Sequence, residues 1–402
     1  MKRFGLLFLV AALSACRGEA PRAPPPPAVT IEEPVDAGEL LALTRSIAES
    51  QRRVFSLLIS KNGHLVYELY TSHLTREHAH YVMSVTKSFT SALMGIAIGE
   101  GLVAGGEASV ADALPSDVFP TAEDRARFRP ITIREVLGMS ALDAQVPPHR
   151  SLPEDVARQK AFFASPNRLQ FALGQALLPE PGVSYQYTDI TPQIASGIIT
   201  HASKMTALEY ANARLFGPLE FQHQEWMHED RAGIDNGAYG LRLRPFDMLK
   251  FGNLYLNEGE WKGRQIVPKE WVKMSFTPWT GPRASTKKPI YGWYWWQFEY
   301  GPGWLAHVAV GWKGQRIAVI PEQNVVVVMT GNITDDETGY FDNIMRAYVR
   351  PAMSRAHASK NELRTLEAEL EALRTSAPRF DGVEGRLIPS IAPKETHHAF
   401  RP

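Results

Sequence analysis

The sequence predicts an α+β fold, in which one antiparallel sheet is built from both ends of the chain and a mostly helical region is inserted between its two halves. Runs of β-branched and aromatic residues occur between residues 55 and 70 and return after Glu270, whereas residues 84–258 show mainly helical spacing of apolar residues. The 402-residue chain is long enough to bury a large core, and its 43 Lys and Arg balance its 43 Asp and Glu. No excess positive charge is left to attract nucleic acid, so we expect a globular enzyme or binding protein.

The N-terminus has the pattern of an export signal. Two basic residues precede an apolar run at 5–13 that is too short to span a bilayer, and Leu-Ser-Ala-Cys follows, ending at Cys16. Residues 1–16 therefore resemble a bacterial lipoprotein signal peptide with its lipobox, and a plain secretory signal is the alternative. The resemblance implies a lipid on Cys16, the only cysteine, in the bacterial cell envelope. Because Arg17 and not aspartate follows, it implies the outer membrane, facing the periplasm.

Residues 17–36 are rich in proline and alanine, which favours an extended, semi-rigid tether. We expect the main folded domain at 37–357 and a C-terminal helix with a loose tail at 358–402, the helix covering 361–374. At the start of the main domain, the Asn62-Gly63 pair predicts a tight hairpin. The expected helices are 38–52, 133–139, 166–177, 191–201 and 246–256, and the expected strands are 55–60, 64–70, 293–298, 305–310, 315–320 and 325–330.

The stretch 81–99 predicts one buried helix with reactive residues at its start. Ser84 and Lys87 stand three residues apart in the first turn, so the amine can reach the hydroxyl. A serine hydroxyl becomes a good nucleophile when a base takes its proton, and a lysine can be that base if burial lowers its pKa. The N–H groups of a helix start also favour an acyl-transfer oxyanion. The pair therefore predicts acyl transfer, and a helix cap followed by a surface lysine is the alternative.

Other motifs that could indicate a catalytic or metal site lie in sequence surroundings that support such a site less well. A second Ser-x-x-Lys copy, Ser285 to Lys288, lies among loop-forming residues where its lysines should be solvated. Ser140 lies in a near match to the Gly-x-Ser-x-Gly elbow, but the last position is leucine. Histidine and acidic residues at 223–230 lack metal-binding spacing and are interpreted as a solvated loop. We expect no metal and no cofactor.

Eight segments, spread over roughly residues 40 to 350 and in the same order, resemble the serine β-lactamase-related hydrolases. They are Gly63, Ser84 to Phe89, and the ranges 131–134, 181–187, 240–252, 266–268, 291–293 and 311–316. The 6-aminohexanoate-dimer hydrolase and carboxylesterase-like members resemble the chain most, and class C β-lactamases and D-alanyl-D-alanine peptidases are more distant. The resemblance implies the DD-peptidase/β-lactamase-like fold.

The resemblance also implies roles for individual residues. Ser84 would be the acylated nucleophile, Lys87 its base, and Tyr187 the tyrosine that passes the proton to the leaving group. Much of the family has Tyr-x-Asn where this chain has Tyr187-Thr188-Asp189. Asp189 either hydrogen-bonds Lys87 as an anion and keeps it charged, or it points elsewhere.

A later motif departs further from the family. Ala309-Val310-Gly311 stands where β-lactamases and D-Ala peptidases carry Lys-Thr-Gly, so a charge-assisted hydrogen bond to a substrate carboxylate, worth about 1.5 to 3 kcal/mol, is missing. The strand can still supply a backbone N–H near Trp312, which would complete an oxyanion hole with that of Ser84. His307 on the same strand either lines the pocket or is an ordinary packed histidine.

These observations lead us to expect a monomeric serine hydrolase that cleaves a small-molecule ester or amide through an acyl-enzyme. It would be tethered to a membrane by the lipid at Cys16 and would have no nucleic-acid partner. The alternatives are a β-lactamase or D-Ala-D-Ala peptidase, and a catalytically silent homologue that binds a cell-wall peptide.

Overall fold

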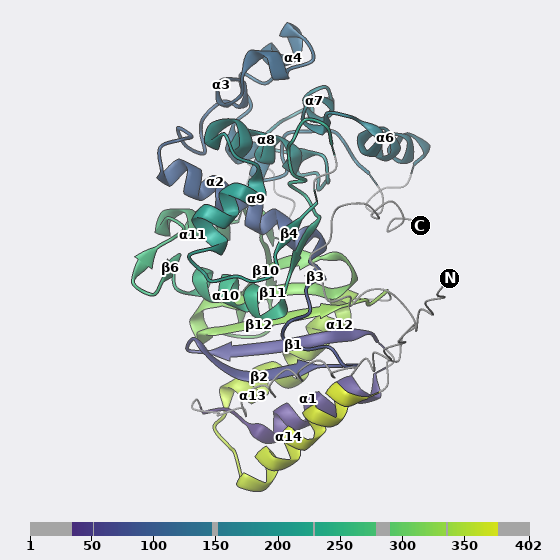
Figure 1. The fold of residues 1–402 in the computed structure, drawn as a ribbon, viewed down its shortest axis with the longest axis vertical. Helices are drawn as coiled ribbons and strands as arrows, with labels where there is room; N and C mark the ends of the chain where they lie inside the picture. Colours follow the sequence, from purple (N-terminus) through teal and green to yellow (C-terminus); the bar gives the residue numbers. More distant parts are fainter. Residues whose placement is uncertain are drawn as a thin grey trace, which may run out of the picture.

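Strands from the two ends of the chain form one antiparallel sheet of seven strands, in the order β2-β1-β12-β11-β10-β9-β8 (Figure 1). The computed structural model describes residues 34–50, 52–146, 152–227, 230–278, 290–334 and 337–376. The two halves of the sheet meet where β1 pairs with β12, with Leu58 opposite Val328. The strands are β1 (Val54–Lys61), β2 (His64–Tyr70), β8 (Ile290–Tyr291), β9 (Trp296–Glu299), β10 (Leu305–Gly311), β11 (Gln315–Ile320) and β12 (Val325–Gly331). The predicted closure of the sheet from both chain ends is confirmed.

Shorter strands form two small sheets outside the main one. Their members are β3 (His80–Tyr81), β5 (Leu241–Leu243) and β4 (Glu225–Trp226) in one sheet, and β6 (Glu260–Trp261) and β7 (Arg264–Gln265) in the other. At the β1–β2 hairpin, Asn62 and Gly63 have φ angles of 51° and 82°. Positive φ at both central residues is what a type I′ hairpin turn requires, and Asn-Gly is a preferred pair for that turn.

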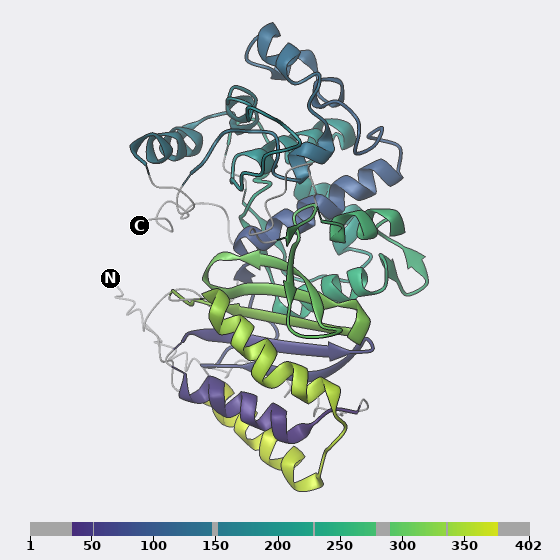
Figure 2. The same cartoon turned by 180° about the vertical axis from the view of Figure 1, so that it is seen from behind.

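Helices cover both faces of the main sheet (Figures 1 and 2). One face carries α1 (Ala37–Glu49), α12 (Glu337–Ile344), the π-helical segment η6 (Met345–Val349), α13 (Arg350–Ser354) and α14 (Lys360–Thr375). The other face carries the inserted helical region: η1 (Met83–Val85), α2 (Thr86–Gly99), α3 (Val110–Ala113), η2 (Ser116–Val118), α4 (Ala122–Arg127), α5 (Ile133–Leu137), α6 (Pro153–Ala164), α7 (Arg168–Leu173), α8 (Thr191–Ser203), α9 (Ala207–Ala211), η3 (Asn212–Phe216), α10 (Pro245–Leu256) and α11 (Lys269–Phe276).

The sheet separates two apolar cores. Alternate residues of a strand point to opposite faces, so Val326 and Val328 pack with the inserted helical region, whereas Val325 and Val327 pack with α1 and its neighbours. Because both faces are covered, β11 and β12 are buried along their whole length and lack the alternation of a half-exposed strand. Helix α2 lies in the first core, where all residues from Thr86 to Ala97 are buried.

The expected strand 293–298 is wrong in its first half. The chain turns between β8 and β9, where the N–H of Gly292 donates to the carbonyl of Trp295 at 2.8 Å, and Tyr294 has a φ of 66°. The reason is burial of the aromatic side chains: Trp293, Tyr294 and Trp295 are at most 6% exposed, and Trp293 packs on Trp271 of α11. The conformation of these three residues is therefore determined by packing in the core and not by pairing within the sheet.

Several expectations fall on residues that the structure does not describe. Cys16, residues 17–33 of the tether, the second Ser-x-x-Lys copy and the tail after residue 376 lie outside the described ranges. Across the described part of the chain, no helix combines the length and hydrophobicity needed to cross a membrane.

His80 on β3 makes the stability of the fold sensitive to acid. The imidazole stacks on Phe55 and is 5% exposed, and neither ring nitrogen has a hydrogen-bond partner among the described residues. Burial, together with the nearby His78 and Arg242, lowers its pKa from 6.5 to about 3. Between these values the unfolded chain binds more protons than the folded one, so stability must fall as the pH drops below 6.5.

We expect His80→Phe to remove this part of the acid sensitivity. Relative to pH 7, the wild type should lose roughly 3 kcal/mol more than the variant by about pH 4. Urea unfolding of both proteins across this range measures the difference. Parallel curves of stability against pH would show that His80 does not carry the effect.

Candidate active site

Ser84 lies in η1, the turn that leads into α2, and its backbone is held on both sides. The N–H of Val82 donates to the carbonyl of Leu241 on β5 at 2.9 Å, and the Thr86 hydroxyl donates to the carbonyl of Met83 at 2.7 Å. Met83 has a φ of 49°, an uncommon conformation for a non-glycine residue. Such positions are kept where the surrounding structure enforces them, and they cluster at functional sites. Ser84 is held between these contacts and is half-buried.

Lys87, one turn further along, points its amine at Ser84. Its Nζ donates to Ser84 Oγ at 2.9 Å, to Asp189 Oδ1 at 2.6 Å and to the carbonyl oxygen of Ala238 at 3.1 Å. Nζ also lies 4.8 Å from the centre of the Tyr187 ring. The structure thus brings Ser84, Lys87, Tyr187 and Asp189 together, although Lys87 and Asp189 are 102 residues apart in the chain.

The charge state of Lys87 differs from the one expected from burial. Burial alone would lower the pKa of the amine, which is 1% exposed, but the charge of Asp189 and the hydrogen bonds that the amine makes to Asp189 and Tyr187 outweigh it and raise the pKa above 10.5. Burial of the helix start does lower the pKa, as expected, but the Asp189 carboxylate, whose contact with Lys87 the sequence left open, reverses the net direction. The raised pKa favours the ammonium form of Lys87, and of the two possibilities for Asp189, the contact with Lys87 is the one observed.

The segment that carries Tyr187 and Asp189 is anchored by the residue between them. Thr188 is fully buried, and its hydroxyl donates to the carbonyl of Ala144 at 2.7 Å and accepts from the N–H of Ile190 at 3.1 Å. The N–H of Gln186 donates to the carbonyl of Met139 at 2.8 Å. These bonds fix the chain just before α8, so that Tyr187 and Asp189 both face Lys87.

The Ala238 carbonyl is a site group that the sequence does not reveal. Asn236, which is buried, accepts hydrogen bonds from the N–H groups of Ala238 and Tyr239 at 2.9 and 3.0 Å, and this turn aims the carbonyl at Lys87. Because the acceptor is a backbone oxygen, the residue type at this position does not indicate the contact with Lys87. The Asn236-Gly237 pair, a turn signal, is the only local hint.

Aromatic rings form one wall beside Tyr187. Its ring lies 6.1 Å from that of Tyr291 and 5.6 Å from that of Trp296, and Tyr185 lies 5.3 Å from Tyr291, measured between ring centres. Tyr291 is 4% exposed, whereas Trp296 is half-buried. Trp295, by contrast, lies in the core, and Trp312 is 51% exposed.

The C-terminal end of β10 lies against the segment that precedes Ser84. A Cβ on Gly311 would come within 2.3 Å of the carbonyl oxygen of Val82, so only glycine allows this approach. The pairing of β10 with β9 ends at Val308 opposite Trp296, and residues 309–311 continue beyond it. Ala309 is fully buried opposite Ile317 on β11. The Lys-Thr-Gly position thus lies at the edge of the site, with a methyl group in place of a cation.

His307 is packed and does not approach Ser84 in the described contacts. Its ring stacks on Phe276 with the centres 3.9 Å apart, and burial lowers its pKa to about 4. It is therefore neutral near pH 7, which favours the interpretation as a packed strand histidine.

Ser140 and Asp230, which belong to the competing motifs, are both packed in the structure. Ser140 is buried, and its hydroxyl donates to the carbonyl of Ser184 at 2.7 Å. Asp230 is 9% exposed and accepts from the N–H groups of Arg168 and Ala232, so this end of the 223–230 segment is packed and not solvated as expected. Within the described residues, no three His, Cys, Asp or Glu side chains are placed to hold a metal ion.

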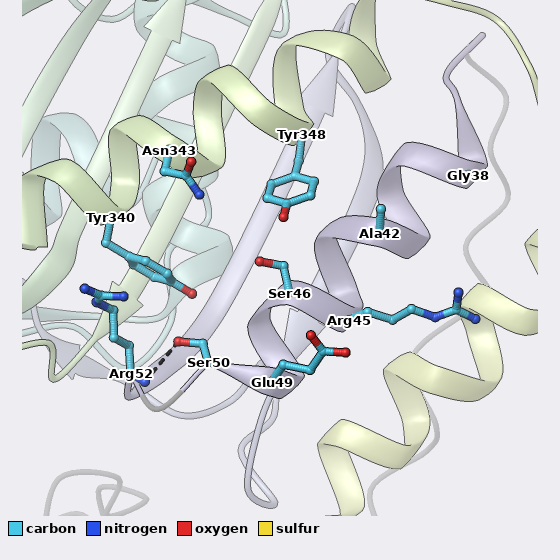
Figure 3. A pocket seen from close by; sticks show the side chains of 10 residues that line it. All are labelled: Gly38, Ala42, Arg45, Ser46, Glu49, Ser50, Arg52, Tyr340, Asn343 and Tyr348. Carbon is cyan, nitrogen blue, oxygen red and sulfur yellow. Dashed lines mark hydrogen bonds between the residues drawn. The ribbon is translucent and has the colours of Figure 1, made fainter.

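A hollow of the described surface lies away from Ser84. It has a volume of about 560 Å³ and lies between α1 and the α12–η6 segment, on the other face of the sheet (Figure 3). Its lining includes Arg45, Glu49, Arg52 and Tyr340. None of the residues around Ser84 contributes to it, so we place the active site by its chemistry and not by the size of a cavity.

Comparison with solved structures shows a penicillin-binding-protein and β-lactamase-like fold. A proposed 6-aminohexanoate-dimer hydrolase from Bacillus anthracis aligns with a TM-score of 0.61 at 22% identity, over 76% of this chain and 81% of the other. A proposed β-lactamase from Bacteroides dorei gives 0.62 at 17% identity, over 80% and 100%. An octameric penicillin-binding protein homologue from Pyrococcus abyssi gives 0.60 at 18% identity, over 80% and 79%. At these identities the likeness concerns the fold.

The β-lactamase family model matches residues 40–348. The chain therefore belongs to the β-lactamase family, as the motif order around Ser84 and Lys87 indicates. The search of curated proteins found no match.

Proposed function

We propose that the protein is a serine hydrolase that cleaves an ester or an unstrained amide through an acyl-enzyme on Ser84. The observation that carries the proposal is the 2.9 Å contact between Lys87 Nζ and Ser84 Oγ at the start of a buried helix. A nucleophile within hydrogen-bond reach of a group that can take its proton, itself oriented by a third group, is the signature of covalent catalysis. Here Asp189 orients Lys87.

In this proposal Ser84 attacks the carbonyl carbon and Lys87 receives the serine proton. Tyr187, whose ring lies beside Nζ, passes a proton to the leaving group. The developing oxyanion is bound by the backbone N–H of Ser84 and by that of Trp312 at the end of β10. The free edge of residues 309–311 and their approach to Val82 support this placement.

The side chains at the edge of β10 indicate which class of substrate the site can bind. Ala309 offers no cation to a carboxylate, so a penicillin or a D-Ala-terminated peptide would lack a charge-assisted hydrogen bond. A neutral ester needs the nucleophile and the oxyanion hole alone. The rings of Tyr291 and Trp296 favour a small apolar acyl group. We propose that this reaction takes place in the bacterial cell envelope, on a monomer anchored through Cys16.

We expect nitrophenyl acetate or butyrate to be hydrolysed with a higher kcat/KM than nitrocefin, because only the β-lactam depends on the missing cation. The comparison uses lipid-free protein that starts after Cys16. A nitrocefin value equal to or above the ester value would favour a β-lactamase. Ala309→Lys should shift the ratio toward nitrocefin, and Ala306→Lys on the opposite face of β10 is the matched control.

A further inference from the structure

The hydrogen bonds of Lys87 pose a problem for its role as a base. An ammonium has three N–H donors and no lone pair, and here acceptors on Ser84, Asp189 and Ala238 lie at hydrogen-bond distance from Nζ. In this state Lys87 donates to Ser84 and cannot receive its proton. One proton must first leave Nζ, so the site needs a group that can hold it.

Asp189 has the position and the chemistry for this task. Its Oδ1 lies 2.6 Å from Nζ, the shortest of the three contacts, and the side chain of Lys87 is 1% exposed whereas that of Asp189 is 23% exposed. The carbonyl of Ala238 cannot take a proton at ordinary pH. A substrate that covers the exposed part of Asp189 would remove water from the ion pair, and loss of water favours a neutral pair over a charged one.

We propose that Asp189 is a positioning residue that stores the proton of Lys87: when substrate covers the site, Asp189 takes one proton from the ammonium and leaves a neutral amine facing Ser84. The inference rests on the proposed acyl-transfer function and deepens it. Where much of the family has asparagine, this chain would use a carboxylate to prepare its base within the site.

The proton steps balance. An Nζ–H bond breaks and an O–H bond forms on Asp189, which turns the ion pair into an amine and a carboxylic acid. The Ser84 O–H then gives its proton to Nζ while Oγ bonds to the carbonyl carbon. When the intermediate collapses, the proton on Nζ goes to the leaving oxygen or nitrogen, directly or through Tyr187. Asp189 finally returns its proton to Nζ.

Several titratable groups on the surrounding elements have pKa values that burial shifts away from neutral pH. The titratable or charged groups on the surrounding elements are Tyr185, Tyr187 and Asp189 before α8, Tyr239 and Arg242 after Gly237, Tyr291 and Tyr294 around β8, and His307 and Lys313 on β10 and the turn after it. Burial raises the pKa of Tyr291 and Tyr294 well above 10, and it lowers that of His307 to about 4. Arg242 is paired with Glu225.

The test is the pH dependence of Ser84 phosphonylation by a small fluorophosphonate, in which Oγ displaces fluoride and must lose its proton. The whole chain, purified in detergent, is compared with Asp189→Asn and, as a second replacement without a carboxylate, Asp189→Ser. Asp143→Asn, a change of the same kind at an exposed aspartate hydrogen-bonded to Gln186, is the matched control. Far-UV spectra and Tm values confirm that each variant is folded.

The proposal predicts the shape of each profile. In the wild type the transferred proton stays within the pair, so the rate should be nearly flat between about pH 6 and pH 9. Without the carboxylate, Lys87 must lose its proton to solvent, so the rate should rise about tenfold per pH unit below the pKa of the amine. The control should keep the wild-type profile.

Either of two results would overturn the inference. A wild-type rate that rises about tenfold per pH unit over this range would mean that Asp189 only restrains the lysine. Flat profiles in both replacement variants would mean that a neutral amine forms without the carboxylate, so that Asp189 is not needed to prepare the base. In both cases labelling of the wild type would leave the proposed function intact, whereas folded wild type that takes no label would contradict the proposed function itself.

Discussion

Ser84→Ala is expected to reduce hydrolysis of a nitrophenyl ester by at least about 10⁴-fold, because the loss of a covalent nucleophile leaves only binding and the oxyanion hole. The Ser84 hydroxyl accepts from Lys87 and lies in a short turn, so its removal should leave the fold unchanged. The measurement is kcat/KM for nitrophenyl butyrate on purified protein.

Ser91→Ala is the matched control, since Ser91 lies on the same helix, is fully buried, and its hydroxyl has no hydrogen-bond partner among the described residues. It should retain near wild-type activity. If Ser84→Ala kept a substantial part of the turnover, a nucleophile on Ser84 would be excluded and the binding-protein alternative would gain support.

Lys87→Arg is expected to lower kcat by roughly 10²- to 10⁴-fold, the usual contribution of a general base. Arginine keeps the positive charge opposite Asp189, but it cannot release a proton at any pH at which the protein is folded. If Lys87 acted only through its positive charge, the arginine variant would therefore keep its activity. If Lys87 transfers a proton, the variant loses it. Steady-state kinetics on the same ester measure the loss.

Lys250→Arg controls for the substitution itself, because Lys250 is a partly buried lysine paired with Asp247 at 3.1 Å and lies outside the site. It should leave kcat unchanged. An arginine variant at position 87 with most of its turnover would show that proton transfer does not pass through this amine.

Local patterns were sufficient to predict the sheet, because the evidence for it lies within short segments. The strand runs at both chain ends and the Asn62-Gly63 turn each carry their own signal, and the structure has them at nearly the predicted bounds. The segment around Trp293 was mispredicted because aromatic residues favour strands and cores alike, and only the tertiary packing against Trp271 decides between them.

For the site, spacing was enough to pair Ser84 with Lys87, since both lie on one turn. The position of Asp189 depends on a loop that the hydrogen bond between Thr188 and Ala144 holds in place. No local sequence pattern reveals this hydrogen bond, so the contact between Asp189 and Lys87 cannot be predicted from the sequence. The direction in which the pKa of Lys87 shifts depends on that contact. The Ala238 carbonyl is a backbone group, so no side chain in the sequence indicates its contact with Lys87.

Peptide mass spectrometry after fluorophosphonate labelling shows directly whether Ser84 is the residue that becomes acylated. We expect one modified peptide, with the phosphonyl group on Ser84, and loss of labelling in Ser84→Ala but not in Ser91→Ala. A label on another residue, such as Ser140, or folded wild-type protein that takes no label at all, would contradict acylation of Ser84.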